Sequence, residues 1–128
     1  MRVAIRLAAW ALVAALLALP AHAGDASGKW AAEFDTQVGV QKYTYDLHVE
    51  EGKLTGTAHF ERMGRAGDVD LVKGKVEGDH VSFVEMLDFQ GNQIEITYEG
   101  TVSVDEIAFT RRVGDFATEE FKARRLAD

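Results

Sequence analysis

Three polar side chains, Glu85, Tyr98 and Arg111, stand where three successive alternating runs of the sequence otherwise place apolar residues. If these runs are neighbouring β-strands, a carboxylate, a phenol and a guanidinium meet on one buried face and are expected to share hydrogen bonds. Burying either charge without a partner would be costly. Two interpretations follow: Arg111 and Tyr98 hold the polar head group of a ligand while Glu85 orients them, or the group is a structural ion pair.

The other residue types that could do chemistry form no comparable pattern. The chain has no cysteine, and His48, His59 and His80 do not have the spacing of a zinc motif. None of the serines stands in a nucleophile motif, and the glycines mark turns rather than a phosphate-binding loop. We therefore expect no catalytic residue, no metal site and no cofactor, and a secreted hydrolase is the most distant alternative.

The stretch from residue 79 to residue 112 predicts the architecture, because it contains three alternating apolar and polar runs separated by two short turns. Strands joined by such short connections pair antiparallel, as a meander. A long meander protects its edges by closing into a barrel or by dividing into two sheets. We expect an all-β, eight-stranded antiparallel up-and-down barrel, with residues 62–67 as its longest flexible connection. The expected strands are residues 30–34, 43–49, 54–60, 69–76, 80–89, 93–102, 106–112 and 119–126.

Turn positions fix the expected register and therefore the inner face of the barrel. The acidic-Gly turn at residues 51–52 places both tyrosines of the second expected strand inside. A turn at residues 91–92 places Glu85 opposite Tyr98, which lies opposite Arg111 on the following strand. A slip of one residue would turn this apolar face to solvent. The residues expected to line a ligand cavity are Tyr43, Tyr45, Glu85, Tyr98 and Arg111.

The outer face is expected to carry one apolar patch, formed by Leu71, Val84 and Met86. Such a patch often marks a protein partner or a homodimer surface; an error in the expected register or a covering loop would equally explain it. The rest of the outer face is polar, which excludes a barrel that spans the outer membrane. The polar residues concerned are Lys73, Lys75, Glu95, Glu99 and Thr110.

The first residues have the pattern of a secretory signal peptide: a basic start, an apolar segment over residues 7–19, and an Ala-His-Ala cleavage site that ends at Ala23. We expect cleavage after Ala23, a single domain over residues 24–128, and a periplasmic or secreted location. Removing residues 1–23 lowers Lys plus Arg from 14 to 12 and leaves Asp plus Glu at 21, a net charge of −9. An acidic domain of this kind is unsuited to nucleic acid, and no membrane span is expected in the mature chain.

Two short motifs carry a resemblance to a known superfamily. Gly28-Lys29-Trp30 opens the first expected strand, and Arg125 shares one face of the last strand with Phe121 and Ala123. A Gly-x-Trp at this place resembles the calycins, which include the lipocalins, the fatty-acid-binding proteins and the avidins. The resemblance implies that Trp30 closes one end of the barrel beneath Arg125. The chain departs from lipocalins in lacking a long lid loop, a C-terminal helix and any disulfide, and it has no residues that match a biotin site.

The sequence therefore leaves two main functions open. The first is an exported binding module for a small amphipathic or polar ligand, held by the five cavity residues named above. The second is a non-catalytic structural or protein-interaction domain with a filled barrel, because eight strands leave little free volume once large side chains point inward.

Overall fold

The computed structural model describes residues 25–127, which form β-strands and short turns. The expected signal peptide lies outside the described residues. Within them, no helix has the length and hydropathy needed to cross a membrane. The strands are β1 (Gly28–Thr36), β2 (Gly39–Glu50), β3 (Lys53–Arg62), β4 (Arg65–Asp70), β5 (Val72–Glu77), β6 (His80–Phe89), β7 (Asn92–Val102), β8 (Glu106–Val113) and β9 (Ala117–Arg125).

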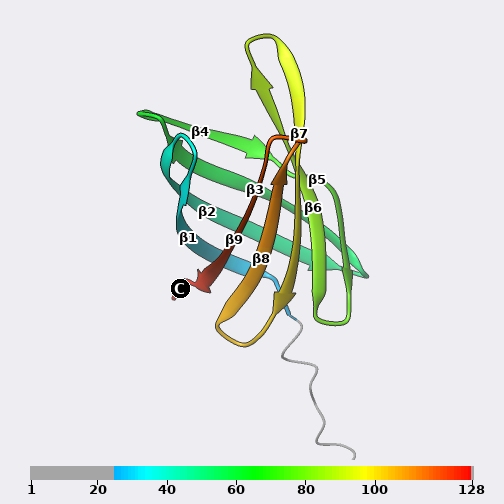
Figure 1. Cartoon of the computed structure of the whole chain (residues 1–128). Coiled ribbons are helices and arrows are strands. Elements are labelled where there is room, and N and C mark those ends of the chain that lie inside the picture. The colour runs from blue at the N-terminus through cyan, green and yellow to red at the C-terminus, as the bar shows by residue number, and fades with distance from the viewer. Residues whose placement is uncertain (1–24, 128) are drawn as a thin grey trace, which may run out of the picture.

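The strands close into an antiparallel barrel, in which β1 pairs with β9 through Trp30 and Arg125. Only Leu71 separates β4 from β5, so these two strands together take one position in the wall, the one predicted for a single strand over residues 69–76. β4 pairs with the second half of β3, whereas β5 bridges the start of β3 and pairs with β6. The prediction of an all-β, eight-stranded up-and-down barrel is therefore confirmed. In Figure 1, β1–β4 run from side to side and β6–β9 run up and down the view.

Two-residue turns set the register of three hairpins. The pairs at 51–52, 63–64 and 90–91 all have positive φ angles, as type I′ turns require. The first gives the predicted β2–β3 register, but the second shows that residues 62–67 are a hairpin and not a flexible connection. The third lies one residue before the predicted turn, so Glu85 is opposite Ile96 and not opposite Tyr98. The resulting shift of two residues keeps Glu85 on the inner face, because side chains alternate with a period of two.

The centre of the barrel is filled with aromatic rings. Phe83 stacks on Tyr98 with ring centroids 4.6 Å apart, and Phe109 meets both rings edge-on at 5.7 and 5.5 Å. Gly100 provides the space for this packing, since a Cβ atom on it would lie 2.8 Å from the Phe109 ring. Such contacts between aromatic rings stabilise the barrel by more than the burial of their apolar area alone. The interior between the two ends is therefore a packed core.

A bulge in β5 corrects the predicted outer patch. Lys73 has a φ of 54°, and the ladder between β5 and β6 shifts between Val72 and Lys75. An extra residue of this kind reverses the facing of the side chains before it. Leu71 therefore belongs to the core, while Val72, the next residue along the chain, is 40% exposed. Val84 is also buried, at 7% exposed, so the predicted exposed patch of Leu71, Val84 and Met86 does not exist as such.

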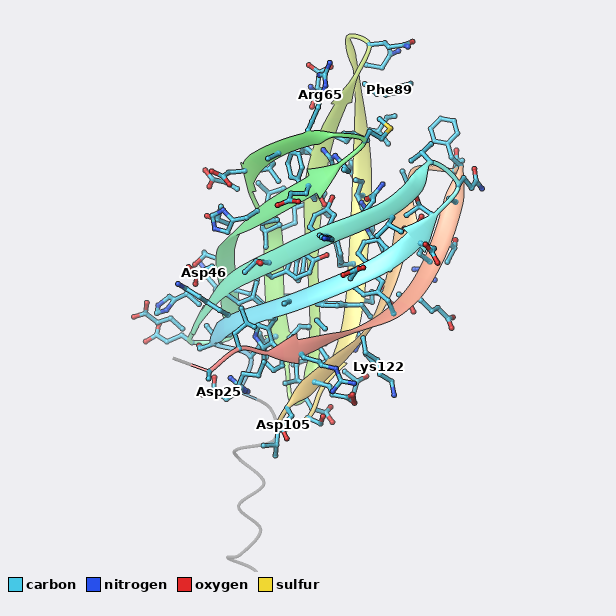
Figure 2. The ribbon with its side chains drawn as sticks, turned by 90° about the vertical axis from the view of Figure 1, so that its left-hand side faces the viewer. Asp25, Asp46, Arg65, Phe89, Asp105 and Lys122 are labelled. Carbon is cyan, nitrogen blue, oxygen red and sulfur yellow. The ribbon has the colours of Figure 1, made fainter. Side chains whose placement is uncertain are left out.

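One end of the barrel, the closed end, is sealed by Trp30 and Arg125. Trp30 is fully buried and donates its indole N–H to Ala26 O over 2.9 Å. The Arg125 guanidinium lies 4.2 Å from the Trp30 ring centroid and donates to the carbonyl oxygens of Asp25 and Ser27, each over 2.9 Å. Both ends of the described chain are therefore tied to this end, where Figure 2 labels Asp25 and Asp105.

Candidate functional site

All five predicted site residues meet in one buried hydrogen-bond network. Tyr98 and Tyr43 donate their hydroxyls to the two carboxylate oxygens of Glu85, over 2.8 and 2.9 Å. Tyr45 donates to the Tyr98 hydroxyl over 3.0 Å. Arg111 donates from Nε to Tyr98 over 2.9 Å and from Nη2 to Tyr43 over 3.1 Å. None of the five is more than 2% exposed.

Two further charged residues complete the network, and the sequence interpretation missed both. Arg62 donates from Nη1 to Tyr43 over 2.6 Å and to Glu85 over 3.1 Å. Glu119 accepts from Nη1 of Arg111 over 2.6 Å. The network thus holds two guanidinium groups and two carboxylates, so its charges balance, as buried charges require. Glu119 could have been found, because it lies opposite Arg111 in the β8–β9 ladder; Arg62 could not, since it was assigned to a loop.

The environment of the network keeps its phenols protonated. Burial, helped by the nearby Glu85 carboxylate, raises the pKa of Tyr43 to about 12. Burial also raises the pKa values of Tyr45 and Tyr98 well above the ordinary tyrosine value. Burial alone would lower the pKa of Arg111, but the oxygens of Tyr98, Tyr43 and Glu85 outweigh it and raise that pKa. The three phenols and the Arg111 guanidinium therefore keep their protons near neutral pH, and the hydrogen-bonded network serves as a floor.

Directly above this floor, a cavity of about 330 Å³ opens at the end of the barrel opposite Trp30. We call this end the mouth; Figure 2 labels Phe89 and Arg65 there. The polar lining includes Gln41, Arg62, Arg111 and Glu119. Apolar side chains of the β6–β7 hairpin and of β8 form the walls, and exposed apolar residues from four turns form the rim. The walls are Leu87, Ile94, Ile96 and Val113; the rim is Val38, Met63, Phe89 and Phe116.

Of the five predicted residues, Arg111 alone lines this cavity. The two phenols bonded to Arg111, together with Tyr45 and Glu85, lie beneath it and hold its guanidinium in place. The structure thus brings the predicted residues together, but most of them support the cavity and do not face it.

A second, larger hollow of about 750 Å³ lies on the outer surface across β9, β1, β2, β3 and β4. Its lining includes several exposed charged side chains, and two of them, His59 and Asp68, pair with each other over 2.6 Å. This hollow is more open to solvent than the cavity at the mouth, which has apolar walls around a few polar groups, the usual character of a small-molecule site. The mouth is therefore the candidate site.

Within residues 25–127, no three His, Asp or Glu side chains gather in a way that could hold a metal ion. Comparison of the chain with protein-family models, with curated proteins and with solved structures gave no match. The function is therefore inferred from the geometry of the mouth.

Proposed function

We propose that this protein is a calycin-like binding module that receives a small amphipathic ligand at the mouth of its barrel. The observation that carries this proposal is the composition of the cavity. Apolar walls from three strands surround a floor whose polar groups are Gln41, Arg62, Arg111 and Glu119. An amphipathic molecule would place its tail between the walls and its head group on the floor.

Two physical features support a binding role. The cavity volume of about 330 Å³ falls at the lower end of the range for small-molecule pockets, roughly 300–1,000 Å³. The floor is also pre-organised, because each nitrogen of Arg111 already has a partner at 2.6 to 3.1 Å. A side chain fixed in this way loses little conformational entropy when a ligand binds.

Native mass spectrometry of the protein purified from its own host tests the proposal. We expect a small molecule to travel with the protein and to be lost from Ala117→Phe, which places a ring in the cavity. The matched control is Ala108→Phe, on the exposed outer face of β8, which should keep the molecule. An unliganded wild-type protein, or equal retention by both variants, would contradict a binding site at the mouth.

A second candidate function is a structural or protein-interaction domain, and the packed aromatic core favours it. The rings of Tyr45, Phe83, Tyr98 and Phe109 fill the centre of the barrel, so a ligand has room only at the mouth. If the mass spectrum shows only the bare chain, this second function is the better interpretation.

We also propose that the domain works after export, in the periplasm or outside the cell. Support comes from the basic start, the apolar segment and the Ala-His-Ala motif that precede Gly24. The intact mass of the protein from its host should correspond to residues 24–128. A mass that includes residues 1–23 in the soluble protein would overturn this proposal.

A further inference from the structure

Gln41 is a buried residue of the mouth whose hydrogen bonding is incomplete. It is 7% exposed and lines the cavity. Among residues 25–127, its Oε1 is the single buried side-chain polar atom without a hydrogen-bond partner. Buried polar atoms in folded proteins are nearly always satisfied, and leaving one without a partner is destabilising. A residue that lines the cavity therefore carries a buried acceptor without a partner.

The neighbours of Gln41 settle which end of its amide is free. The Thr36 hydroxyl gives its single hydrogen to Gly39 O over 2.8 Å, so it can only accept from Gln41. The amide nitrogen must then be the group that faces Thr36, at 3.4 Å. Turning the amide over would bring two acceptors together. The unpartnered group of Gln41 is thus its carbonyl oxygen.

Arg62 supplies the complementary donors. Its Nη1 is occupied by Tyr43 and Glu85, but its Nε and Nη2 have no hydrogen-bond partner within the described residues. Its side chain is 15% exposed and lines the same cavity. The floor thus offers one free acceptor, on Gln41, and free donors, on Arg62.

The charges of the floor are already neutralised. Arg62 pairs with Glu85 and Arg111 pairs with Glu119, over 3.1 and 2.6 Å. A carboxylate head group would add an unbalanced negative charge and, having acceptors only, would leave Gln41 Oε1 unsatisfied. An ammonium group could satisfy Gln41, but it would stand beside two guanidinium groups and could accept nothing from Arg62.

From these observations we infer that the ligand has an uncharged head group that both donates and accepts hydrogen bonds, such as a primary amide or an alcohol, on an apolar tail. The inference rests on the function proposed above. Gln41 would select this head group by accepting its hydrogen, while Arg62 donates to its oxygen. The apolar walls would bind the tail equally well whichever head group the ligand carries.

Titration calorimetry with four ligands of equal tail length tests the inference: decanamide, decanol, decanoate and decylammonium at neutral pH. We expect the amide and the alcohol to bind about tenfold more tightly than either ion, a difference of about 1.4 kcal/mol. Gln41→Leu should weaken binding of the amide and the alcohol but not of decanoate, which has no hydrogen to give to Gln41, while the tail still binds. Gln37→Leu, at an exposed position of the same lining, should leave the preference unchanged.

The outcomes separate this inference from the proposed function. Equal affinity for all four ligands, tighter binding of decanoate, or a preference over decanoate that Gln41→Leu leaves at its full size would overturn the choice of head group while leaving a binding site at the mouth. No binding of any of the four would overturn the site itself and the inference with it.

Discussion

The two ends of the barrel are built in opposite ways. At the closed end, Trp30 is fully buried and Arg125, which is partly buried, covers its ring and binds backbone carbonyls. At the mouth, Arg111 is 2% exposed and forms the floor of a cavity with an apolar rim. Each end thus uses an arginine against aromatic rings. The comparison shows that an arginine beside aromatic rings closes the end of the barrel where it binds backbone carbonyls. An arginine beside aromatic rings forms the floor of a cavity where it binds other side chains.

The largest effect is expected from Arg111→Met. Removing this guanidinium leaves Glu119 and two buried phenols without their partner, which should lower the free energy of unfolding by about 3 to 5 kcal/mol. Urea unfolding followed by circular dichroism measures the loss. The control is Arg112→Met, the exposed neighbour, which should change stability by less than about 0.5 kcal/mol. Similar losses in the two variants would show that the buried network does not support the mouth.

Alkaline pH is expected to weaken the mouth end next. The folded protein holds the Tyr43 proton with a pKa of about 12, against 10.0 in the unfolded chain. The contribution of Tyr43 to the free energy of unfolding is therefore fully present below about pH 10. It is lost as the pH rises toward 12, which lowers the free energy of unfolding by about 2 to 3 kcal/mol. The chain has three tyrosines, all in the network, so the absorbance of tyrosinate reports on it alone. Tyrosinate that appears near pH 10 while the fold persists would be incompatible with this account.

A smaller effect is expected at the closed end. Arg125→Ala removes the cation–π contact with Trp30 and the hydrogen bonds to three carbonyl oxygens. Because Arg125 is only partly buried, we expect a loss of about 1 to 2 kcal/mol and a change in Trp30 fluorescence. Arg124→Ala, at the exposed neighbouring position, is the control. If Arg125→Ala lowered the free energy of unfolding more than Arg111→Met does, the closed end and not the mouth would contribute more to stability.

The smallest effect on stability, but a clear one on binding, is expected at the rim. Phe116 at the mouth is 69% exposed and Val104 at the closed end is 62% exposed, so replacing either with serine should change stability by less than about 0.5 kcal/mol. Phe116→Ser should weaken binding of decanamide several-fold in calorimetry, because it removes apolar surface next to the tail. Val104→Ser should leave the binding of decanamide unchanged. Equal weakening by both variants would mean that the ligand does not use the mouth.

The sequence predicted the fold and the membership of the network well, because both depend on alternation. Glu85, Tyr98 and Arg111 remain on the inner face even though the β6–β7 turn lies one residue earlier than expected, since a shift of two residues preserves facing. A bulge does not preserve facing, because it adds a single residue to one strand. The positive φ falls on Lys73, which is not a glycine, and strict alternation was carried through this position, so Leu71 was placed on the wrong face.

The cavity itself could not be predicted from the pattern of the strands. Its polar lining includes Arg62 and Gln41, and both lie near turns whose type was not recognised. Met63-Gly64 is a tight hairpin turn, so Arg62 is the last residue of β3 and not part of a loop, and its guanidinium reaches Glu85. Gln41 stands at a buried position of β2 that polarity alone would assign to the surface. Which inner residues face open space, and which lie beneath others, depends on packing in three dimensions.

The bonds from Arg125 to Asp25 and Ser27 also determine how the molecule can be attached to anything else. Because the first and last described residues leave from the closed end, a tether, affinity tag or fused domain at either terminus would orient the barrel with its mouth away from the support. Surface-immobilised protein should therefore keep the cavity at the mouth open to solvent whichever terminus is anchored.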